Sequence, residues 1–248
     1  MNIIKYLSLI IGCSIGWMAC NTEESDHLGD EELGLNYYPV ALGKFWDYRL
    51  DSVWYKLSNQ VEQHRSVSFI REEIVDTFRD VTGQLIYRLD VFQSTDTVSG
   101  WELIDSYFLE TNDRLLVKRE KGLSYIRLVF PPQTGKSWNG NIHIHPKTQI
   151  NIQGEFLEPF DQWLYYFEYV DRNESINGIH YEDVCKVIEV DDENIIQKRY
   201  SSALYSRNVG LIYKELLLLE TQNTDTSVPF EDRAEKGMIL KQTLVSHN

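Results

Sequence analysis

The chain has 248 residues, of which 42% are hydrophobic, 12% aromatic and 25% charged. This length and composition suit a globular protein with one large or two small hydrophobic cores, and they exclude collagen-like, low-complexity and wholly disordered chains. Thirty-eight acidic residues against 24 basic residues give a net charge of −14. Affinity for nucleic acid depends chiefly on Lys and Arg contacts to phosphate, and the sequence has no basic cluster. We therefore predict no nucleic-acid partner.

Residues 1–19 have the pattern of a secretory leader. A basic start with Lys5 precedes an apolar run of 13 residues, Tyr6 to Met18. A bilayer core of about 30 Å requires about 20 helical residues to cross it, so the run is too short for a transmembrane helix. Its length matches the apolar core of a signal peptide, and we predict that residues 1–19 are removed.

The leader ends in Ala19-Cys20, a small residue directly before a cysteine. This pair resembles the lipobox of bacterial lipoproteins, which implies cleavage before Cys20 and acylation of its sulfur, with palmitate among the usual chains. Trp17 departs from that pattern, and Cys13 matches its letters better. Cleavage at Cys13 would leave a core of only about seven apolar residues, so we predict lipidation at Cys20. The alternative is an ordinary signal peptide with an incidental cysteine.

The segment after Cys20 is strongly acidic. Residues 21–34 contain six acidic residues and no Lys or Arg, which predicts a solvated tether over residues 20–36. Acidic residues behind a lipidated cysteine also resemble the surface-export signal of bacteroidete-type lipoproteins. We therefore predict a lipid-anchored protein of the outer membrane, with the cell surface favoured over the periplasmic face. Cys185 is then the one thiol left, and we predict that it is buried.

From residue 37 onward, apolar and polar residues alternate. Between Trp46 and Trp54, one parity is mainly aromatic and aliphatic and the other mainly charged. Turn residues separate such runs, at Thr82-Gly83, Asn112-Asp113, Asn139-Gly140, Asn177-Gly178 and Asp191-Asp192. Runs of this kind predict an all-β fold of roughly eleven strands, in which curved antiparallel sheet forms a half-barrel, a barrel or a sandwich.

The chain also contains a weak internal repeat. The segment Tyr38 to Trp46 aligns with Phe130 to Trp138, Glu73 to Asp76 aligns with Glu168 to Asp171, and Gly122 to Tyr125 aligns with Gly210 to Tyr213. We predict two tandem β units, residues 37–129 and residues 130–248, packed as one globular body. The alternative is independent use of the same strand-opening residues, in which Pro and Gly shape the turn and Trp begins the strand.

Two motifs carry a family resemblance. Tyr38-Pro39, Gly43, Trp46 and Tyr48 near the start, and Val209 to Tyr213 near the end, resemble bacteroidete-type outer-membrane lipoproteins. The resemblance spans most of the chain after the leader and implies a curved antiparallel sheet or sandwich on a lipid tether. Its motifs are structural and the family carries no assigned activity, so it implies nothing about a ligand.

No motif for catalysis or metal binding is complete. Gly135-Lys136-Ser137 resembles the end of a phosphate-binding loop, but the glycine required five residues earlier is replaced by Phe130. His143 and His145 would share one face of a strand, yet a zinc site needs further ligands and none is nearby. We therefore predict no catalytic residue, no cofactor and no metal.

Aromatic residues are the richest feature of the chain. Trp163, Tyr165, Phe167 and Tyr169 fall on one face of a predicted strand. Such a stripe either packs into the core or forms a stacking surface for sugars or for a protein partner, so these four residues are the candidate binding face.

Together these patterns predict a non-catalytic, lipid-anchored binding or scaffold module of the cell envelope. A glycan or an outer-membrane protein complex is the expected partner. The alternatives are a hydrolase whose residues converge only in the fold, and a purely structural envelope component. A deep pocket with two or more convergent acids would favour the hydrolase, and a shallow aromatic face would favour binding.

Overall fold

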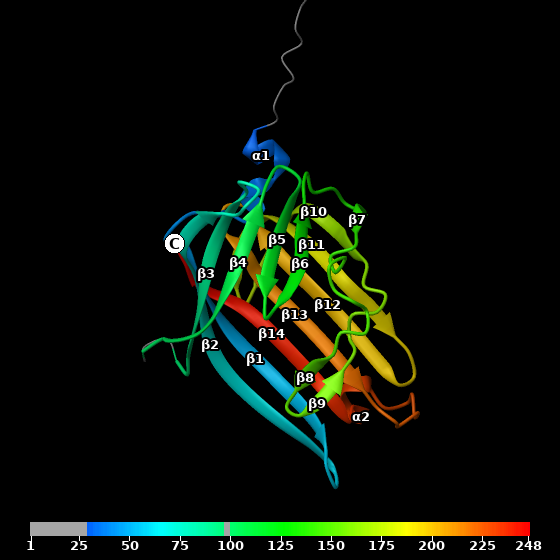
Figure 1. The fold of residues 1–248 in the computed structure, drawn as a ribbon. Coiled ribbons are helices and arrows are strands. Elements are labelled where there is room, and N and C mark those ends of the chain that lie inside the picture. Colours follow the sequence, from blue (N-terminus) through cyan, green and yellow to red (C-terminus); the bar gives the residue numbers. More distant parts are fainter. Residues whose placement is uncertain (1–28, 97–99) are drawn as a thin grey trace, which may run out of the picture.

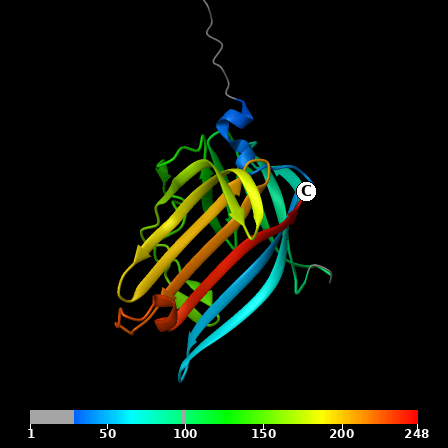
Figure 2. The ribbon, with the colours of Figure 1, turned by 180° about the vertical axis from the view of Figure 1, so that it is seen from behind.

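The computed structural model describes residues 29–96 and 100–248. The predicted signal peptide and the predicted lipidation site, Cys20, lie outside these residues. Twelve of the described strands form one antiparallel sheet that curves around an interior (Figures 1 and 2), which confirms the all-β prediction. Within the same residues, no helix is long and apolar enough to cross a membrane.

The first half of the sheet follows the order of the chain. Its strands are β1 (Phe45–Leu57), β2 (Val61–Arg79), β3 (Leu85–Ser94), β4 (Glu102–Thr111), β5 (Leu115–Glu120) and β6 (Leu123–Val129). Each strand pairs with the next along the chain, so this half is a meander. Because side chains alternate between the two faces of a strand, one parity of each strand points into the interior.

The second half is also a meander, and its strands follow one another around the sheet in the same sense as those of the first half. Its strands are β7 (Ser137–Trp138), β10 (Tyr165–Ile176), β11 (Ile179–Glu193), β12 (Gln197–Ser206), β13 (Gly210–Glu220) and β14 (Lys236–His247). A separate hairpin, β8 (Ile150–Ile152) and β9 (Glu155–Leu157), lies between β7 and β10 in sequence, and α2 (Phe230–Arg233) precedes β14. β14 pairs with β1 and joins the two halves.

The two outer edges of the sheet also meet. The Ile126 N–H donates to the Gly140 carbonyl at 2.8 Å, and the Trp138 Nε1–H donates to the Ile126 carbonyl at 2.9 Å. These bonds bring β6 against the segment that begins with β7. The sheet is therefore nearly closed, in agreement with the curved or barrel form among the predicted alternatives.

Most predicted turns lie between strands, and one is displaced. Asn177 and Gly178 connect β10 to β11 with φ values of 51° and 82°, the left-handed conformations that a two-residue hairpin turn requires. Asp191 and Asp192, by contrast, lie inside β11. The turn there falls at Asn194, whose side chain accepts hydrogen bonds from the N–H groups of the residues two and three positions on.

The predicted tether is folded over its last residues, which corrects the prediction for residues 30–36. Asp30–Leu33 forms the short helix α1, and Leu35–Tyr37 forms a turn of 3-10 helix. Gly34, with φ of 76°, ends α1 in the left-handed conformation. Arg207 then holds this segment by donating to the Glu31 carbonyl at 3.0 Å. The composition of this segment gives no sign of the contact, because Arg207 lies far away in the sequence, in the turn between β12 and β13.

The segments that open the two predicted units make similar backbone contacts. The Gly43 N–H donates to the Ile74 carbonyl at 2.8 Å, and the Gly135 N–H donates at 2.8 Å to the carbonyl of Phe167, two residues before the position aligned with Ile74. The third anchor differs, because Gly122 lies in the turn between β5 and β6, the last two strands of its half, whereas Gly210 begins β13, the last strand but one of its half. The division into units 37–129 and 130–248 stays a prediction.

A dense aromatic core fills the interior beside α1. Tyr37, Trp46 and Tyr48 are fully buried, and the Trp46 Nε1–H donates to the Val209 carbonyl at 2.6 Å. A Cβ on Gly210 would lie 2.8 Å from that Nε1 atom, so glycine is required for the close approach. This core blocks one end of the interior, and Figure 1 shows α1 at the same end.

Candidate functional site

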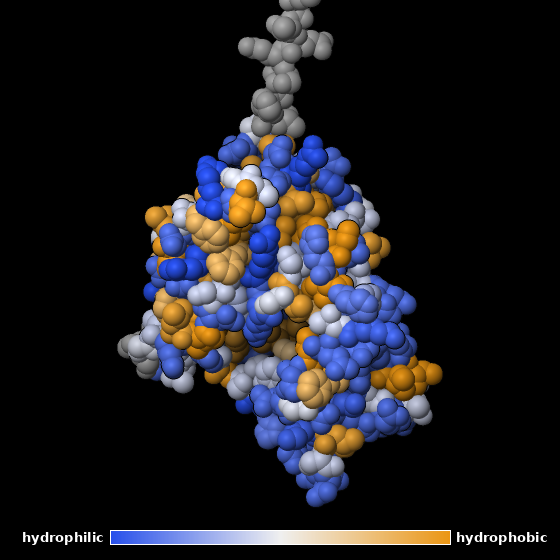
Figure 3. All heavy atoms as spheres, viewed as in Figure 1, coloured by the Kyte–Doolittle hydropathy of each residue, from blue (hydrophilic) through white to orange (hydrophobic). Residues whose placement is uncertain are grey.

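A cavity of about 960 Å³ occupies the rest of the interior. Inward positions on nearly all strands of the sheet line it, together with residues 148–163 of the segment between β7 and β10. Figure 3 shows the surface hollowed below the turn between β5 and β6 and above the β8–β9 hairpin. Small-molecule sites commonly have volumes of about 300–1,000 Å³, so the cavity has the size of a ligand site.

Much of the cavity wall is apolar. The apolar lining residues on the strands of the large sheet include Leu50, Trp54, Ile70, Val91, Leu109, Leu116, Leu216, Leu218, Met238 and Leu240. The segment before β10 adds Ile150, Ile152, Phe160 and Trp163. Such a wall takes up the apolar part of a ligand by removing it from water.

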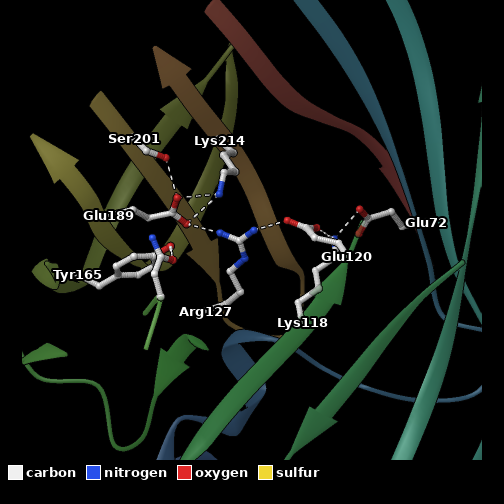
Figure 4. Close-up of polar contacts among 9 residues, drawn as sticks. Glu72, Lys118, Glu120, Arg127, Tyr165, Glu189, Ser201 and Lys214 are labelled. Atoms are coloured by element: carbon white, nitrogen blue, oxygen red, sulfur yellow. Dashed lines mark hydrogen bonds and ion pairs between the residues drawn. The ribbon is translucent and has the colours of Figure 1, made fainter. Parts of the chain in front are cut away.

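A chain of buried charges crosses the interior of the sheet (Figure 4). Lys118 of β5 donates to Glu72 of β2 at 2.6 Å and lies 3.5 Å from Glu120. Arg127 of β6 contacts Glu120 on one side and donates to Glu189 of β11 at 3.0 Å on the other. The chain therefore links the first half of the sheet to the second.

The far end of this chain is equally well paired. Lys214 of β13 donates to both carboxylate oxygens of Glu189 at 2.8 Å, and the Ser201 hydroxyl donates to the same carboxylate at 2.6 Å. Glu189 is 1% exposed. A buried carboxylate is tolerated only with such partners, because an unpaired charge in the interior is strongly unfavourable.

The ion pairs keep the carboxylates ionised. Burial alone would raise the pKa of Glu120, but Arg127 and Lys118 outweigh burial and lower that pKa to about 2. Burial would likewise raise the pKa of Glu189, and Lys214 and Arg127 lower it instead. A general acid needs a carboxyl group whose pKa is raised toward neutrality, and these two groups have the opposite shift.

Three buried polar atoms on neighbouring strands have no hydrogen-bond partner among the described residues. They are the Tyr48 hydroxyl on β1, Glu72 Oε2 on β2 and Gln242 Nε2 on β14. Glu72 pairs with Trp46 of β1 and Gln242 pairs with Leu50, so these two residues lie on opposite sides of Tyr48 along β1. All three side chains share the inward face, and of the three, Glu72 and Gln242 line the cavity.

The predicted aromatic stripe lies in the core. Tyr165 and Phe167 are 0% exposed, Tyr169 is 7% exposed and Trp163 is 9% exposed. The stripe therefore offers no open stacking surface on the outside of the protein. Trp163 alone of the four lines the cavity.

The other residues singled out from the sequence are placed as follows. Cys185 is fully buried, as predicted, and burial raises the pKa of its thiol. His143 and His145 are exposed, and they lie in the turn region after β7 and not on a strand as expected. Residues 29–96 and 100–248 contain no group of three or more His, Cys, Asp or Glu that could hold a metal ion.

Sequence reasoning missed the buried charges. Lys118 and Glu120 belong to a run of charged residues, Lys118 to Lys121, that resembles a solvated hairpin end. One signal was present at Glu189, because that residue interrupts the apolar run Val187 to Val190. A charged residue within such a run indicates a buried pair, but its partners come from strands far away in the sequence.

Comparison with known proteins gives two distant structural likenesses. No protein-family model matches the chain, and no curated protein matches it. A crystal structure from Bacteroides fragilis, provisionally named an exported protein with a YmcC-like fold, matches with a TM-score of 0.35 and 8% identity over 85% of this chain and 98% of that one. A provisionally named lipoprotein from Parabacteroides distasonis matches with a TM-score of 0.35 and 11% identity over 86% and 98% of the two chains. At these TM-scores, neither likeness bears on function.

Proposed function

We propose that this chain is a non-catalytic binding module of the cell envelope that holds a small molecule inside its curved sheet. The cavity of about 960 Å³ carries the proposal. It combines an apolar wall with a few buried polar groups, which is the usual composition of a small-molecule site. The lipobox-like Ala19-Cys20 supports attachment to the outer membrane through an acyl chain on Cys20, with the cell surface as the favoured side.

The charge arrangement supports binding over hydrolysis. Four acids line the cavity, which by number alone would suit a hydrolase. Three of them, Glu72, Glu120 and Glu189, are each paired with a base, and the pKa values of Glu120 and Glu189 are lowered. Neither of those two carboxyl groups can donate a proton near neutral pH.

A glycan or an outer-membrane protein complex stays the predicted partner class. The aromatic stripe, one candidate surface for such a partner, is buried. The interior site is therefore the one that the geometry favours.

Binding of N-phenyl-1-naphthylamine tests the proposal. This neutral aromatic amine fluoresces strongly in apolar surroundings, and we expect saturable binding with one site per chain. Ser68 lines the cavity, whereas the adjacent Val67 is exposed. Ser68→Phe should weaken the binding by placing a ring in the cavity, and Val67→Phe, on the opposite face of the same strand, should leave it unchanged.

Thermal unfolding checks that both variants are folded. Failure of the wild-type protein to bind the probe saturably, or equal binding by the two folded variants, contradicts an interior site.

A further inference from the structure

We infer that the interior site takes an uncharged amphiphile whose headgroup carries several hydroxyl groups, as a sugar does, and contacts Ser66, Ser68 and Gln93 at the mouth of the cavity. Its apolar chain lies deeper, along the cavity wall. This inference rests on the proposed function and specifies its ligand class. Three observations carry it: the common face of these three side chains, their exposure, and the change of polarity along the cavity wall.

The three side chains lie together on the inward face of β2 and β3. Ser66, Ser68 and Ile70 alternate along β2, so their side chains point to the same face. Gln93 of β3 pairs directly with Ile70, which makes it a diagonal neighbour of Ser68. Diagonal neighbours lie about 7–8 Å apart, so one headgroup can contact both side chains. Ser66, Ser68 and Gln93 all line the cavity.

These side chains mark the mouth of the cavity. Ser66 and Gln93 are exposed although both line the cavity, and Ser68 is partly exposed. The pairing of β2 with β3 begins only at Phe69, so Ser66 and Ser68 lie at an edge that no other described strand covers. A headgroup at this place keeps its contact with water while the chain behind it is buried.

The chemistry of the mouth favours a headgroup with several hydroxyl groups. Ser66, Ser68 and Gln93 are uncharged, and each can both donate and accept hydrogen bonds. The Ser66 hydroxyl shares one hydrogen bond with Ser52 at 2.8 Å and retains at least one lone pair. Neighbouring hydroxyl groups of a sugar also donate and accept, so they can pair with these side chains in either direction. An ether headgroup mainly accepts, and an ionic headgroup would leave water for side chains that offer no opposite charge.

The cavity wall changes from polar to apolar across four neighbouring strands. Ser66 of β2 pairs with Ser52 of β1, which in turn pairs with Leu240 of β14. Leu240 pairs with Leu216 of β13, and all four residues line the cavity. An amphiphile therefore fits with its headgroup over β2 and its chain over β14 and β13. The adjacent row on β1, β14 and β13 is entirely apolar and lines the cavity as well: Trp54, Met238 and Leu218.

The charged side chains of the cavity favour no ionic headgroup. Lys118, Arg127 and Lys214 are each paired with a buried carboxylate. An ionic headgroup would have to break such a pair to gain a partner. The other two charged lining residues, Asp105 and Lys121, have opposite signs.

A series of decyl compounds tests the headgroup. Decyl maltoside, pentaethylene glycol monodecyl ether, decyl sulfate and decyltrimethylammonium share one chain length. Each competes with N-phenyl-1-naphthylamine for the wild-type protein, below the concentration at which it forms micelles. We expect decyl maltoside to displace the probe at about tenfold lower concentration than each of the others, since two net hydrogen bonds correspond to about that factor. Displacement by any of the other three at a concentration equal to or below that of decyl maltoside overturns the inference.

Two matched substitutions locate the headgroup. Gln93→Met removes the amide at the mouth with little change of shape, and Gln242→Met makes the same change deeper in the cavity lining. We expect Gln93→Met to reduce the preference for decyl maltoside over the ether to less than about threefold, and Gln242→Met to leave it unchanged. Equal preference in the two folded variants overturns this placement.

The double variant Ser66→Ala with Ser68→Ala changes only small side chains near the end of β2, and it should lower the same preference. Probe binding separates the two failures. Absence of saturable probe binding contradicts the proposed function, whereas normal probe binding without a preference for decyl maltoside contradicts only the headgroup assignment.

Discussion

The two ends of the interior use the same inward face of β1 in different ways. Beside α1, that face carries Trp46 and Tyr48, which are fully buried against other aromatic rings. Toward the other end, it carries Leu50, Ser52 and Trp54, which line the cavity. The same alternate residues of β1 point inward at both ends. The two ends therefore differ in the size of these side chains and in the groups that face them across the interior. Buried charges from β2, β5, β6, β11 and β13 form a charged layer that lines the same cavity (Figure 4).

The largest expected effect comes from breaking that charged layer. Arg127→Met removes the base between Glu120 and Glu189 and leaves the Glu120 carboxylate with one base fewer in a buried setting. We expect the free energy of unfolding to fall by about 3–5 kcal/mol, measured by urea denaturation at neutral pH.

Arg119→Met is the matched control, because Arg119 pairs with Glu110 at 2.7 Å on a partly exposed surface. Its effect should stay below about 1 kcal/mol. Equal losses for the two variants would mean that the charged layer does not hold the two halves of the sheet together.

The contrast between the two ends of β1 is sharpened by a pair of tryptophan substitutions. Trp46→Ala should cost about 3–5 kcal/mol of unfolding free energy, because it opens a hole in a packed core and removes the hydrogen bond to Val209. Trp54→Ala should cost about 1–2 kcal/mol, because its ring already borders a cavity. A cost for Trp54→Ala as large as that for Trp46→Ala would show that the cavity region is packed as tightly as the core.

The third expected effect is a dependence of stability on acid pH. The pKa of Glu120 is about 2 in the folded protein, below the value of about 4.3 expected in the unfolded chain. A lowered pKa in the folded state means that the stabilisation is complete above pH 4.3 and is lost as the pH falls toward 2. We expect a loss on the order of 3 kcal/mol over that interval, measured by urea denaturation at several pH values.

Glu120→Gln should flatten this dependence, since the amide does not titrate. Glu110→Gln, a change at the surface pair with Arg119, should retain most of it. An unchanged slope in Glu120→Gln would assign the acid sensitivity to other carboxylates.

Local features of the fold were predictable because they depend on neighbouring residues. Alternation from Trp46 to Trp54 indicates a strand, and Asn177-Gly178 favours a hairpin turn because both residues adopt left-handed conformations readily. Burial of Cys185 was predicted from the small, apolar character of its side chain. The turn at Asp191-Asp192 was placed a few residues early, because charged residues at the end of β11 extend the strand by pairing with β12.

The candidate site was beyond prediction from the same patterns. Glu72 lies 46 residues from Lys118, and Arg127 lies 62 residues from Glu189. Contacts across the sheet have no fixed sequence period. Apart from Glu189, which interrupts an apolar run, nothing in the local pattern distinguishes these charges from solvated ones.

The amino-acid sequence by itself determined the strands, most turns and the parity of each strand, because these follow from backbone preferences and from alternation along the chain. Only the tertiary structure decided that the aromatic stripe faces the core, that residues 30–36 are folded, and that six charges meet inside the sheet. Curvature and near-closure of the sheet set which inward side chains face one another across the interior. The distance between facing side chains depends on the whole sheet, so the sequence of a single segment does not reveal it.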